Sequence, residues 1–433
     1  SSGIGMEIMQ VELWVWAVTI AVLGVILVTD FVVQLRRPHE PTFRESAIQV
    51  SIYITLALLF TFVIGGVWSP QYAAEYIAGW VTEYSLSVDN IFVFLIIFTQ
   101  FAVRAQAHIA AAVKALRAGE LVAFPTETVY GLGADAGNPA ALLRVYAVKG
   151  RPTDHPLILH LADVAELSRW VAPLSAPTAV LVERLTQQFW PGPLTLVLPR
   201  AAEVSPVLTG GQTSIAVRVP SHPVAQRLLR AFGSGIAAPS ANRYGRVSPT
   251  RAEHVREEFP AGVAILEGGD CEVGVESTIL SLLETPPRIL RPGIIGREQL
   301  EALIGPLADG SSQTAPRVPG STPQHYAPQT PVELVSTHEL DARIETCNAS
   351  GEAVAVLARR SPETRLALAC GATPLHVRRW LQAPAASAAY AHDLYANLRS
   401  LDKENAARIL IEQVPASPEW DAVRDRLNRA AAR

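Results

Sequence analysis

From His108 to the C-terminus, short apolar runs alternate with amphipathic helical stretches such as residues 109–120 and 139–149. This alternation restricts the fold more than any other feature, because strands mixed with helices at this density pack as helices layered on a sheet. We therefore predict an α/β fold with a sizeable sheet. The runs expected to form its strands are residues 121–125, 156–161, 194–199, 214–220, 236–242, 263–269, 277–282 and 288–292.

The first 104 residues have a different pattern, with three long apolar stretches at residues 13–29, 48–67 and about 76–103. Each stretch is about as long as the hydrocarbon core of a bilayer demands. The alternative explanation is that these are buried helices of a soluble core. We predict that residues 1–104 form an N-terminal all-α transmembrane segment of three helices.

Loop charge predicts the orientation of this segment. Arg36, Arg37 and Arg44 lie between the first two apolar stretches, and the loop after the second carries no cation. Since cytoplasmic loops are enriched in Lys and Arg, the third span would return the chain to the cytoplasm at Arg104. We expect a cytoplasmic enzyme domain, anchored to the inner face of the plasma membrane. A cleavable signal peptide is not expected, because no basic region precedes the first apolar stretch.

Charge and cysteine content exclude several classes of protein. Residues 1–104 carry four Lys/Arg and eight Asp/Glu, which accounts for the whole net charge of −4. The remainder is balanced and has no strongly basic nucleic-acid surface. Cys271, Cys347 and Cys370 are far apart, which fits a reducing compartment and argues against a protein-bound zinc ion or a disulfide framework.

The loop "VKGRPTDHP", residues 148–156, places Lys149 and Arg151 one glycine apart. Gly150 and Pro152 predict a rigid loop at this point, in place of a helix or strand. Two fixed cations on a stiff loop between hydrophobic segments favour a phosphate-bearing ligand.

Further polar residues lie at the ends of the predicted strands. Period-two alternation places Ser214, Ala216 and Arg218 on one face of their strand. The other polar side chains at strand ends are Thr128, His155, His160, Ser240, Asn242, Ser248, Ser277, Thr278, Arg288 and Arg291.

This set is rich in hydroxyls and cations and poor in carboxylates, so it suits an anionic ligand. It suits acid–base hydrolysis badly, since no paired acids and no Ser-His-Asp order stand out. Taken singly, such arginines are usually solvated, and such histidines are usually structural. The chain has neither of the glycine-rich phosphate-binding motifs GxxxxGK[ST] and GxGxxG, so a nucleotide would have to be bound by another arrangement of residues. The residues alone predict an anion-binding α/β enzyme.

Seven of these segments, in their order, resemble the YrdC-type domain of the L-threonylcarbamoyl-AMP synthases. The resemblance spans residues 108 to about 300. It predicts a YrdC-like twisted mixed sheet with flanking helices. The segments are "FPTETVYGLG", "KGRPTDHPLILHL", "WPGPLTLVL", "AVRVPSHP", "APSAN", "GVESTI" and "ILRPG".

The resemblance implies a reaction in which L-threonine, bicarbonate and ATP form threonylcarbamoyl-AMP and pyrophosphate. A tRNA-modifying transferase complex would then move the threonylcarbamoyl group to tRNA; direct tRNA binding by this chain stays open. Mg²⁺ is expected with ATP, held largely by phosphate oxygens and water. Such a reaction mainly needs positioning and charge neutralisation.

The resemblance also implies roles for single residues. Arg218 would grip the carboxylate of threonine, and Ala238 would contribute backbone contacts. The implied threonine set is Thr128, His160, Arg218, Ala238 and Ser277; the implied ATP set is Arg151, His155, Ser214, Ser240, Ser248, Arg291 and Tyr326; the implied catalytic set is Lys149, Arg151, Ser240 and Asn242.

The remainder of the chain resembles the longer, two-domain form of the family. We predict a catalytic domain at residues 105–305, a linker at residues 306–330 that packs over the active site, and a small Rossmann-like α/β domain at residues 331–433. In the linker, "HYAP" would bring Tyr326 over the nucleotide.

The stretch "EYSLSVDNIFVFLIIFTQF" resembles the TerC family of integral membrane proteins, which is linked to metal-ion homeostasis. The resemblance covers residues 6 to about 103 and is truncated, since the later spans of the family are missing. Three alternative functions therefore accompany the synthase: a membrane ion-homeostasis protein, an RNA-binding module of the same fold, and a carbamoyl transferase of hydrogenase maturation. The last would bring zinc-ligating cysteine pairs, and the chain has none.

Overall fold

The computed structural model divides into two compact units, residues 1–100 and 101–433, and each is described by itself. The structure describes residues 12–14, 17–18, 20–21, 24–25, 43–260, 262–310, 315–320, 325–362 and 377–432. Most of the first predicted membrane span therefore lies outside the described residues, and so does Cys370.

Two helices account for the second and third apolar stretches, α2 (Phe43–Val67) and α3 (Pro70–Arg117). Helix α3 joins the predicted span at residues 76–103 to the predicted helix that begins at residue 109. No glycine or proline lies between Gly79 and Gly119 to interrupt it. Within the described residues, no helix has both the length and the apolar character needed to cross a bilayer. The predictions of transmembrane helices, of a TerC-like segment and of a membrane anchor are therefore not supported.

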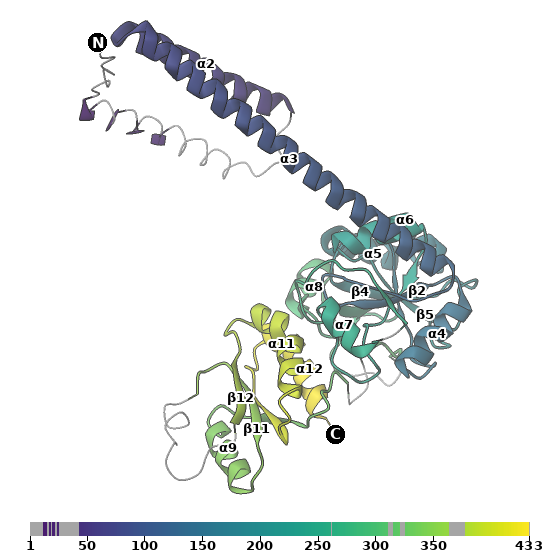
Figure 1. Ribbon diagram of the computed structural model, residues 1–433. Coiled ribbons are helices and arrows are strands. Elements are labelled where there is room, and N and C mark those ends of the chain that lie inside the picture. The colour runs from purple at the N-terminus through teal and green to yellow at the C-terminus, as the bar shows by residue number, and fades with distance from the viewer. Residues whose placement is uncertain are drawn as a thin grey trace. The chain divides into compact units, whose positions relative to one another are not determined.

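The part of the second unit that precedes the linker is built on a mixed sheet (Figure 1), as the sequence predicts. Among the described residues it has nine strands in the order β7-β1-β2-β6-β3-β5-β4-β8-β9, with both parallel and antiparallel pairs. Its strands are β1 (Val122–Phe124), β2 (Gly131–Asp135), β3 (Ile158–His160), β4 (Leu194–Pro199), β5 (Ser214–Arg218), β6 (Ile236–Ala237), β7 (Ala264–Ile265), β8 (Thr278–Ser281) and β9 (Arg288–Arg291).

Strand β2 was not among the strands predicted from the sequence. It pairs with β1 in antiparallel register, Val122 opposite Gly133. A Cβ on Gly133 would lie only 2.8 Å from the Phe124 ring, so close contact between neighbours explains the glycine.

The two faces of the sheet are covered differently. Leu159 and Val217 pack in a core with helices α4, α5 and α8. On the other face, the end of α3 and helix α6 cover β1 and β6, whereas Ile158 and Ala216 pack against Val318 of the linker. The central strands therefore have one face that the linker covers. The helices are α4 (Pro139–Lys149), η1 (Val164–Arg169), α5 (Ala176–Phe189), α6 (Pro223–Phe232), α7 (Ala252–Glu258) and α8 (Arg297–Ile304).

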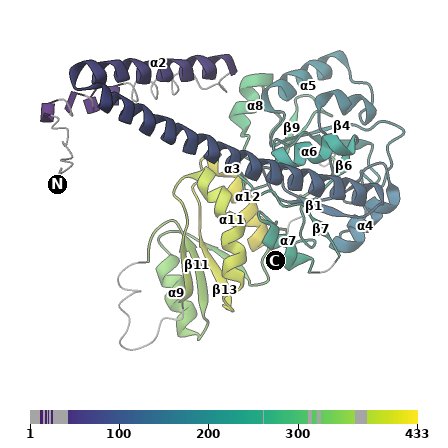
Figure 2. The ribbon, with the colours of Figure 1, turned by 45° about the horizontal axis from the view of Figure 1, so that its top comes forward.

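The C-terminal part has a smaller sheet of parallel strands in the order β10-β13-β11-β12. Figure 2 shows α9 and α11 on opposite sides of it; α9 packs on Val354 and Val356, and α11 and α12 pack on Ala355 and Leu357. Strand β12, "VRRWLQ", was not predicted because its edge position leaves Arg379 exposed and hides the apolar pattern. The elements are β10 (Val332–Val335), α9 (Leu340–Ala349), β11 (Val354–Ala358), β12 (Val377–Gln382), α11 (Ser387–Asp402), β13 (Arg408–Glu412), η2 (Pro418–Trp420) and α12 (Asp421–Ala431).

Candidate active site

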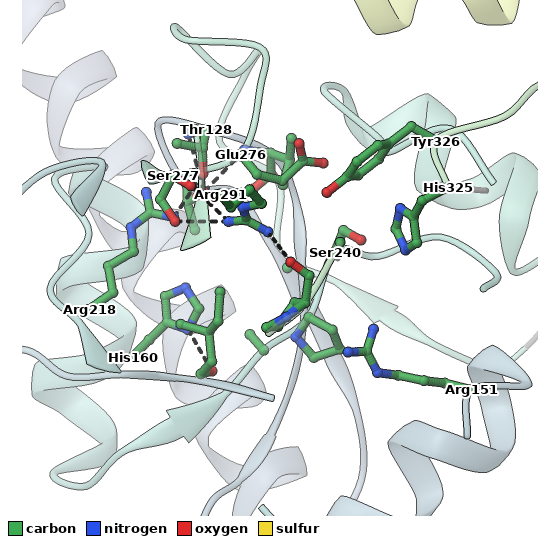
Figure 3. A pocket seen from close by; sticks show the side chains of 18 residues that line it. Thr128, Arg151, His160, Arg218, Ser240, Glu276, Ser277, Arg291, His325 and Tyr326 are labelled. Atoms are coloured by element: carbon green, nitrogen blue, oxygen red, sulfur yellow. Dashed lines mark hydrogen bonds between the residues drawn. The ribbon is translucent and has the colours of Figure 1, made fainter. Parts of the chain in front are cut away.

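A cavity of about 40 Å³ lies on the face of the sheet that the linker covers (Figure 3). It is lined by residues of the first and the last of the family motifs and by residues of the linker. Nine of the predicted site residues are in the lining: Thr128, Arg151, His160, Arg218, Ala238, Ser240, Ser277, Arg291 and Tyr326.

One end of the cavity is built from β3 and β5. These strands pair in parallel with His160 directly opposite Arg218, so the pleat presents both side chains to the cavity. Arg218 Nη1 donates to Thr128 Oγ1 (2.9 Å), and its Nε donates to the Gly192 carbonyl (3.3 Å). Burial, with the charge of Arg218 second, lowers the pKa of His160 to about 3, so its imidazole is neutral at pH 7.

Glu127 fixes the orientation of Arg218 from behind. Its Oε1 lies 2.6 Å from Arg218 Nη2, and both side chains are 4% exposed. Glu127 Oε2 also accepts from the backbone N–H of Ser221 (3.1 Å). The carboxylate therefore neutralises and holds a buried guanidinium whose remaining N–H groups face the cavity.

Arg151 lies on the other side of the cavity from Arg218, whereas Arg291 lies beside Ser277 (Figure 3). Helix α4 ends at Gly150, which adopts φ 65°, and the chain turns there to direct Arg151 inward. Arg151 Nη2 donates to the Pro156 carbonyl (2.9 Å), and its guanidinium lies over the Tyr244 ring. Burial lowers the pKa of Arg151 and of Arg291 from the usual value, because removing a cation from water disfavours its charged form.

Arg291 organises the strand end that carries Ser277. Its Nε and Nη2 donate to the Ser277 carbonyl (3.1 and 2.9 Å), and Nη2 also reaches Ser277 Oγ (3.1 Å). Its Nη1 donates to the carbonyl of Pro319 in the linker (3.0 Å). One side chain therefore joins the β8 end to the linker.

Lys149 does not line the cavity. Its Nζ donates to the carbonyls of Ser240 (2.6 Å) and Asn242, so it holds the loop that presents Ser240. Burial, and then the charge of Arg151, lowers the pKa of this amine well below its usual value.

The other predicted residues outside the lining lie in the surrounding layer. Asn242 Nδ2 donates to the carbonyls of Arg243 and Arg246, which shapes the same loop. His155 Nδ1 lies 3.2 Å from the Tyr244 hydroxyl. Ser248 Oγ donates to Glu276 (2.6 Å), and Ser214 is buried at the start of β5.

Nine lining residues were not predicted, and the two with ionisable side chains are Glu276 and His325. Glu276 directly precedes Ser277, and His325 directly precedes Tyr326. Their place in the same motifs as these predicted residues could have identified them. Burial lowers the pKa of His325 to about 3. Glu276 is the carboxylate of the described lining, and its two oxygens are bonded to Ser248, Tyr395 and Arg426.

Glu276 should make the stability of the chain depend on pH. Burial alone would raise its pKa, but Arg426, Arg291 and the Ser248 hydroxyl outweigh burial and lower it to about 2. A carboxyl group whose pKa is lowered on folding stabilises the fold at pH values above its unfolded pKa of 4.5. This contribution to the free energy of unfolding, on the order of 3 kcal/mol in all, is lost as the pH falls toward 2.

We therefore expect Glu276→Gln to lower the thermal midpoint at pH 7, with a gap to the parent that closes between pH 4.5 and pH 2. Differential scanning calorimetry of both proteins across that range measures the gap. A gap that stays constant down to pH 2 contradicts the assignment of a buried, ion-paired carboxylate.

Two family models match the second unit. One, described as telomere recombination, matches residues 114–293, and the other, described as the C-terminal domain of threonylcarbamoyl-AMP synthase, matches residues 295–432. The threonylcarbamoyl-AMP synthase of Bacillus subtilis is 40% identical over 75% of this chain and 93% of its own length. That of Pyrococcus abyssi is 38% identical over 73% of this chain and 92% of its own length.

The solved structures give the same result. The crystal structure of Pyrococcus abyssi Sua5 complexed with L-threonine has a TM-score of 0.66 and 36% identity, covering 75% of this chain and 94% of that one. Sequence and fold agree over both domains, and the chain belongs to the threonylcarbamoyl-AMP synthase family.

Proposed function

We propose that this chain joins L-threonine, bicarbonate and ATP into threonylcarbamoyl-AMP and releases pyrophosphate. One observation carries the proposal. A single cavity is lined by Arg218, Thr128 and His160, which suit a carboxylate, and also by the cations Arg151 and Arg291. The related synthases favour this function over an RNA-binding module or a membrane ion-homeostasis protein.

Threonine would bind at the Arg218 end. The guanidinium offers its free N–H groups to the amino acid carboxylate, and the Thr128 and Ser277 hydroxyls are hydrogen-bond partners for the substrate hydroxyl or amine. Neutral His160 adds a hydrogen bond without adding charge.

The chemistry then proceeds toward the Arg151 end. The threonine amine condenses with bicarbonate to a carbamate and water. A carbamate oxygen attacks the α-phosphorus of ATP, the bond to the bridging oxygen of the β-phosphate breaks, and pyrophosphate leaves with that electron pair. Arg151 and Arg291 would neutralise charge on the phosphates, and Lys149 and Asn242 would hold Ser240 in place.

Mg²⁺ fits this site when ATP carries it. Among the described residues no group of three His, Cys, Asp or Glu side chains could hold a metal ion. Glu276 is occupied by Arg426, Tyr395 and Ser248. The ion would be bound by phosphate oxygens and water, where it supplies further charge neutralisation.

Substrates require displacement of the linker. A cavity of about 40 Å³ holds only a few water molecules. Pro319, Gly320, His325 and Tyr326 of the linker form part of its wall. We infer that the linker moves outward to admit ATP. The product would then pass to a transferase acting on tRNA, as the class of reaction that consumes an activated carbamoyl adenylate.

The test is incubation of the full chain with ATP, Mg²⁺, bicarbonate and each amino acid in turn, with pyrophosphate as the readout. Threonine should give the fastest release, and serine, which lacks the methyl group, should be slower by about 10–200-fold in kcat/KM. Omission of bicarbonate is the control. Release that is independent of threonine or of bicarbonate contradicts the proposal.

A further inference from the structure

A second cavity, of about 290 Å³, shares no lining residue with the candidate active site. It lies where the loop at residues 243–247, the end of α7, the linker and the end of α11 meet. One water molecule needs roughly 10–15 Å³, so an ion of several heavy atoms fits in this cavity. The cations in its lining are Arg243, Arg246, Arg399 and Lys403.

The three carboxylates that border this second cavity already have partners. Asp402 accepts hydrogen bonds from two backbone N–H groups of the linker (2.9 and 2.7 Å). Glu258 Oε1 accepts from Arg399 Nη2 (2.9 Å), and Glu257 Oε1 accepts from Lys403 Nζ (2.5 Å). These carboxylates therefore neutralise Arg399 and Lys403 but leave the two arginines of the loop.

The arginines of the loop have no carboxylate partner among the described residues. Arg243 is exposed, and its guanidinium makes no hydrogen bond or ion pair with that part of the chain. Arg246 donates from Nη1 (3.1 Å) and Nη2 to a neutral acceptor, the side-chain amide oxygen of Gln329. The lining therefore presents two cationic side chains whose charge is not neutralised.

Arg399 adds a buried donor to this lining. Its side chain is 9% exposed, and its Nε has no hydrogen-bond partner among the described residues. A buried donor without a partner is costly unless a ligand accepts its hydrogen bond. This atom indicates that the second cavity binds a hydrogen-bond acceptor.

The charges of the lining indicate which acceptor fits. Four cations against three carboxylates leave one net positive charge, and arginine forks match the oxygens of a phosphate group. An RNA backbone would carry several negative charges past the carboxylates, of which Glu257 has a side chain that is 42% exposed. A small anion avoids that repulsion.

We propose that the second cavity is an anion-binding site for the phosphate group of a small molecule, separate from the substrate cavity. Arg243 and Arg246 bind the phosphate oxygens, and Arg399 Nε donates a further hydrogen bond. This inference concerns binding alone and does not rest on the proposed function.

A purely structural role is the alternative, because Arg399 and Lys403 of α11 also connect that helix to Glu257 and Glu258 of α7. Such a role does not need Arg243, which makes no polar contact with the described residues. The two arginines of the loop are therefore the residues to change.

The test is isothermal titration calorimetry of the full chain with inorganic pyrophosphate and, separately, with inorganic phosphate at constant ionic strength. The variant Arg243→Gln/Arg246→Gln should bind one ion fewer per chain than the parent, with affinity at this site reduced about 100-fold or more. Arg151→Ala should retain this site, because Arg151 lines the other cavity. The ion should raise the thermal midpoint of the parent more than that of the double variant.

The matched control is Arg227→Gln/Arg230→Gln. These two exposed arginines of α6 have the same spacing, so the control removes the same two charges away from the cavity. It should bind both ions as the parent does. If the variant of the loop does not fold, Arg243→Gln alone replaces it, since that side chain has no polar contact to lose among the described residues.

Equal binding of the ions by the parent and the loop variant would overturn the proposal, as would equal losses in the two double variants. A parent that binds neither ion, but binds a tRNA transcript more tightly than the loop variant does, would also overturn it in favour of an RNA contact. Pyrophosphate release with threonine and bicarbonate is a separate measurement, so failure of this site leaves the proposed function standing.

Discussion

Arg151→Ala is expected to reduce pyrophosphate release by about 10²–10³-fold, equivalent to roughly 3–4 kcal/mol of transition-state stabilisation. Its guanidinium is 6% exposed in the cavity wall and has an N–H, at Nε, without a partner among the described residues. A phosphate oxygen there would meet a preorganised, poorly hydrated cation. Steady-state release with saturating ATP and threonine measures the loss in kcat.

Two further variants make this result interpretable. Arg151→Lys retains the charge but not the planar pair of N–H groups, so it should recover only part of the activity. Arg230→Ala removes an exposed arginine from α6 and should leave activity unchanged. Near-parental activity of Arg151→Ala, with a normal thermal midpoint, would refute a role for this cation.

Arg218→Ala should raise the KM for threonine by about 100-fold or more, since the substrate carboxylate loses charge-assisted hydrogen bonds worth about 1.5–3 kcal/mol each. It should also destabilise the fold, because Glu127 is left buried without its cation, at about 3–5 kcal/mol. Threonine titrations and thermal unfolding report the two effects separately.

The pair Glu127→Gln and Arg218→Met separates binding from stability. Removing both charges should recover much of the lost thermal midpoint, because no isolated charge remains buried. Threonine affinity should not recover, since no cation faces the carboxylate. If threonine affinity returned together with stability, Arg218 would have only a structural role.

Much of this cavity was predictable because strand geometry is local. Period-two alternation placed Ala216 and Arg218 on one face, and the structure shows Ala216 facing the linker side and Arg218 in the cavity wall. His160 follows from the same rule, given that β3 lies beside β5. The roles of these residues remain predictions.

Lys149 shows where local reasoning ended. Its charge and its place next to Arg151 predict a phosphate contact, and this stays a prediction; in the structure its amine donates to two carbonyls about ninety residues away along the chain. The direction of a long side chain at a helix end depends on what the fold brings near it. Glu276 was missed for the same reason, because its partners Tyr395 and Arg426 belong to the other domain.

The sequence by itself determined the alternating elements and the mixed α/β class, and it predicts an anionic ligand, because each depends on propensity, periodicity or residue type. The tertiary structure alone decided which charges neutralise one another and how far α3 continues. Those outcomes require distant segments, such as those of Glu276 and Arg426, which are 150 residues apart, to meet in a dry interior. There the cost of burying a charge selects its partner, and no local pattern records that choice.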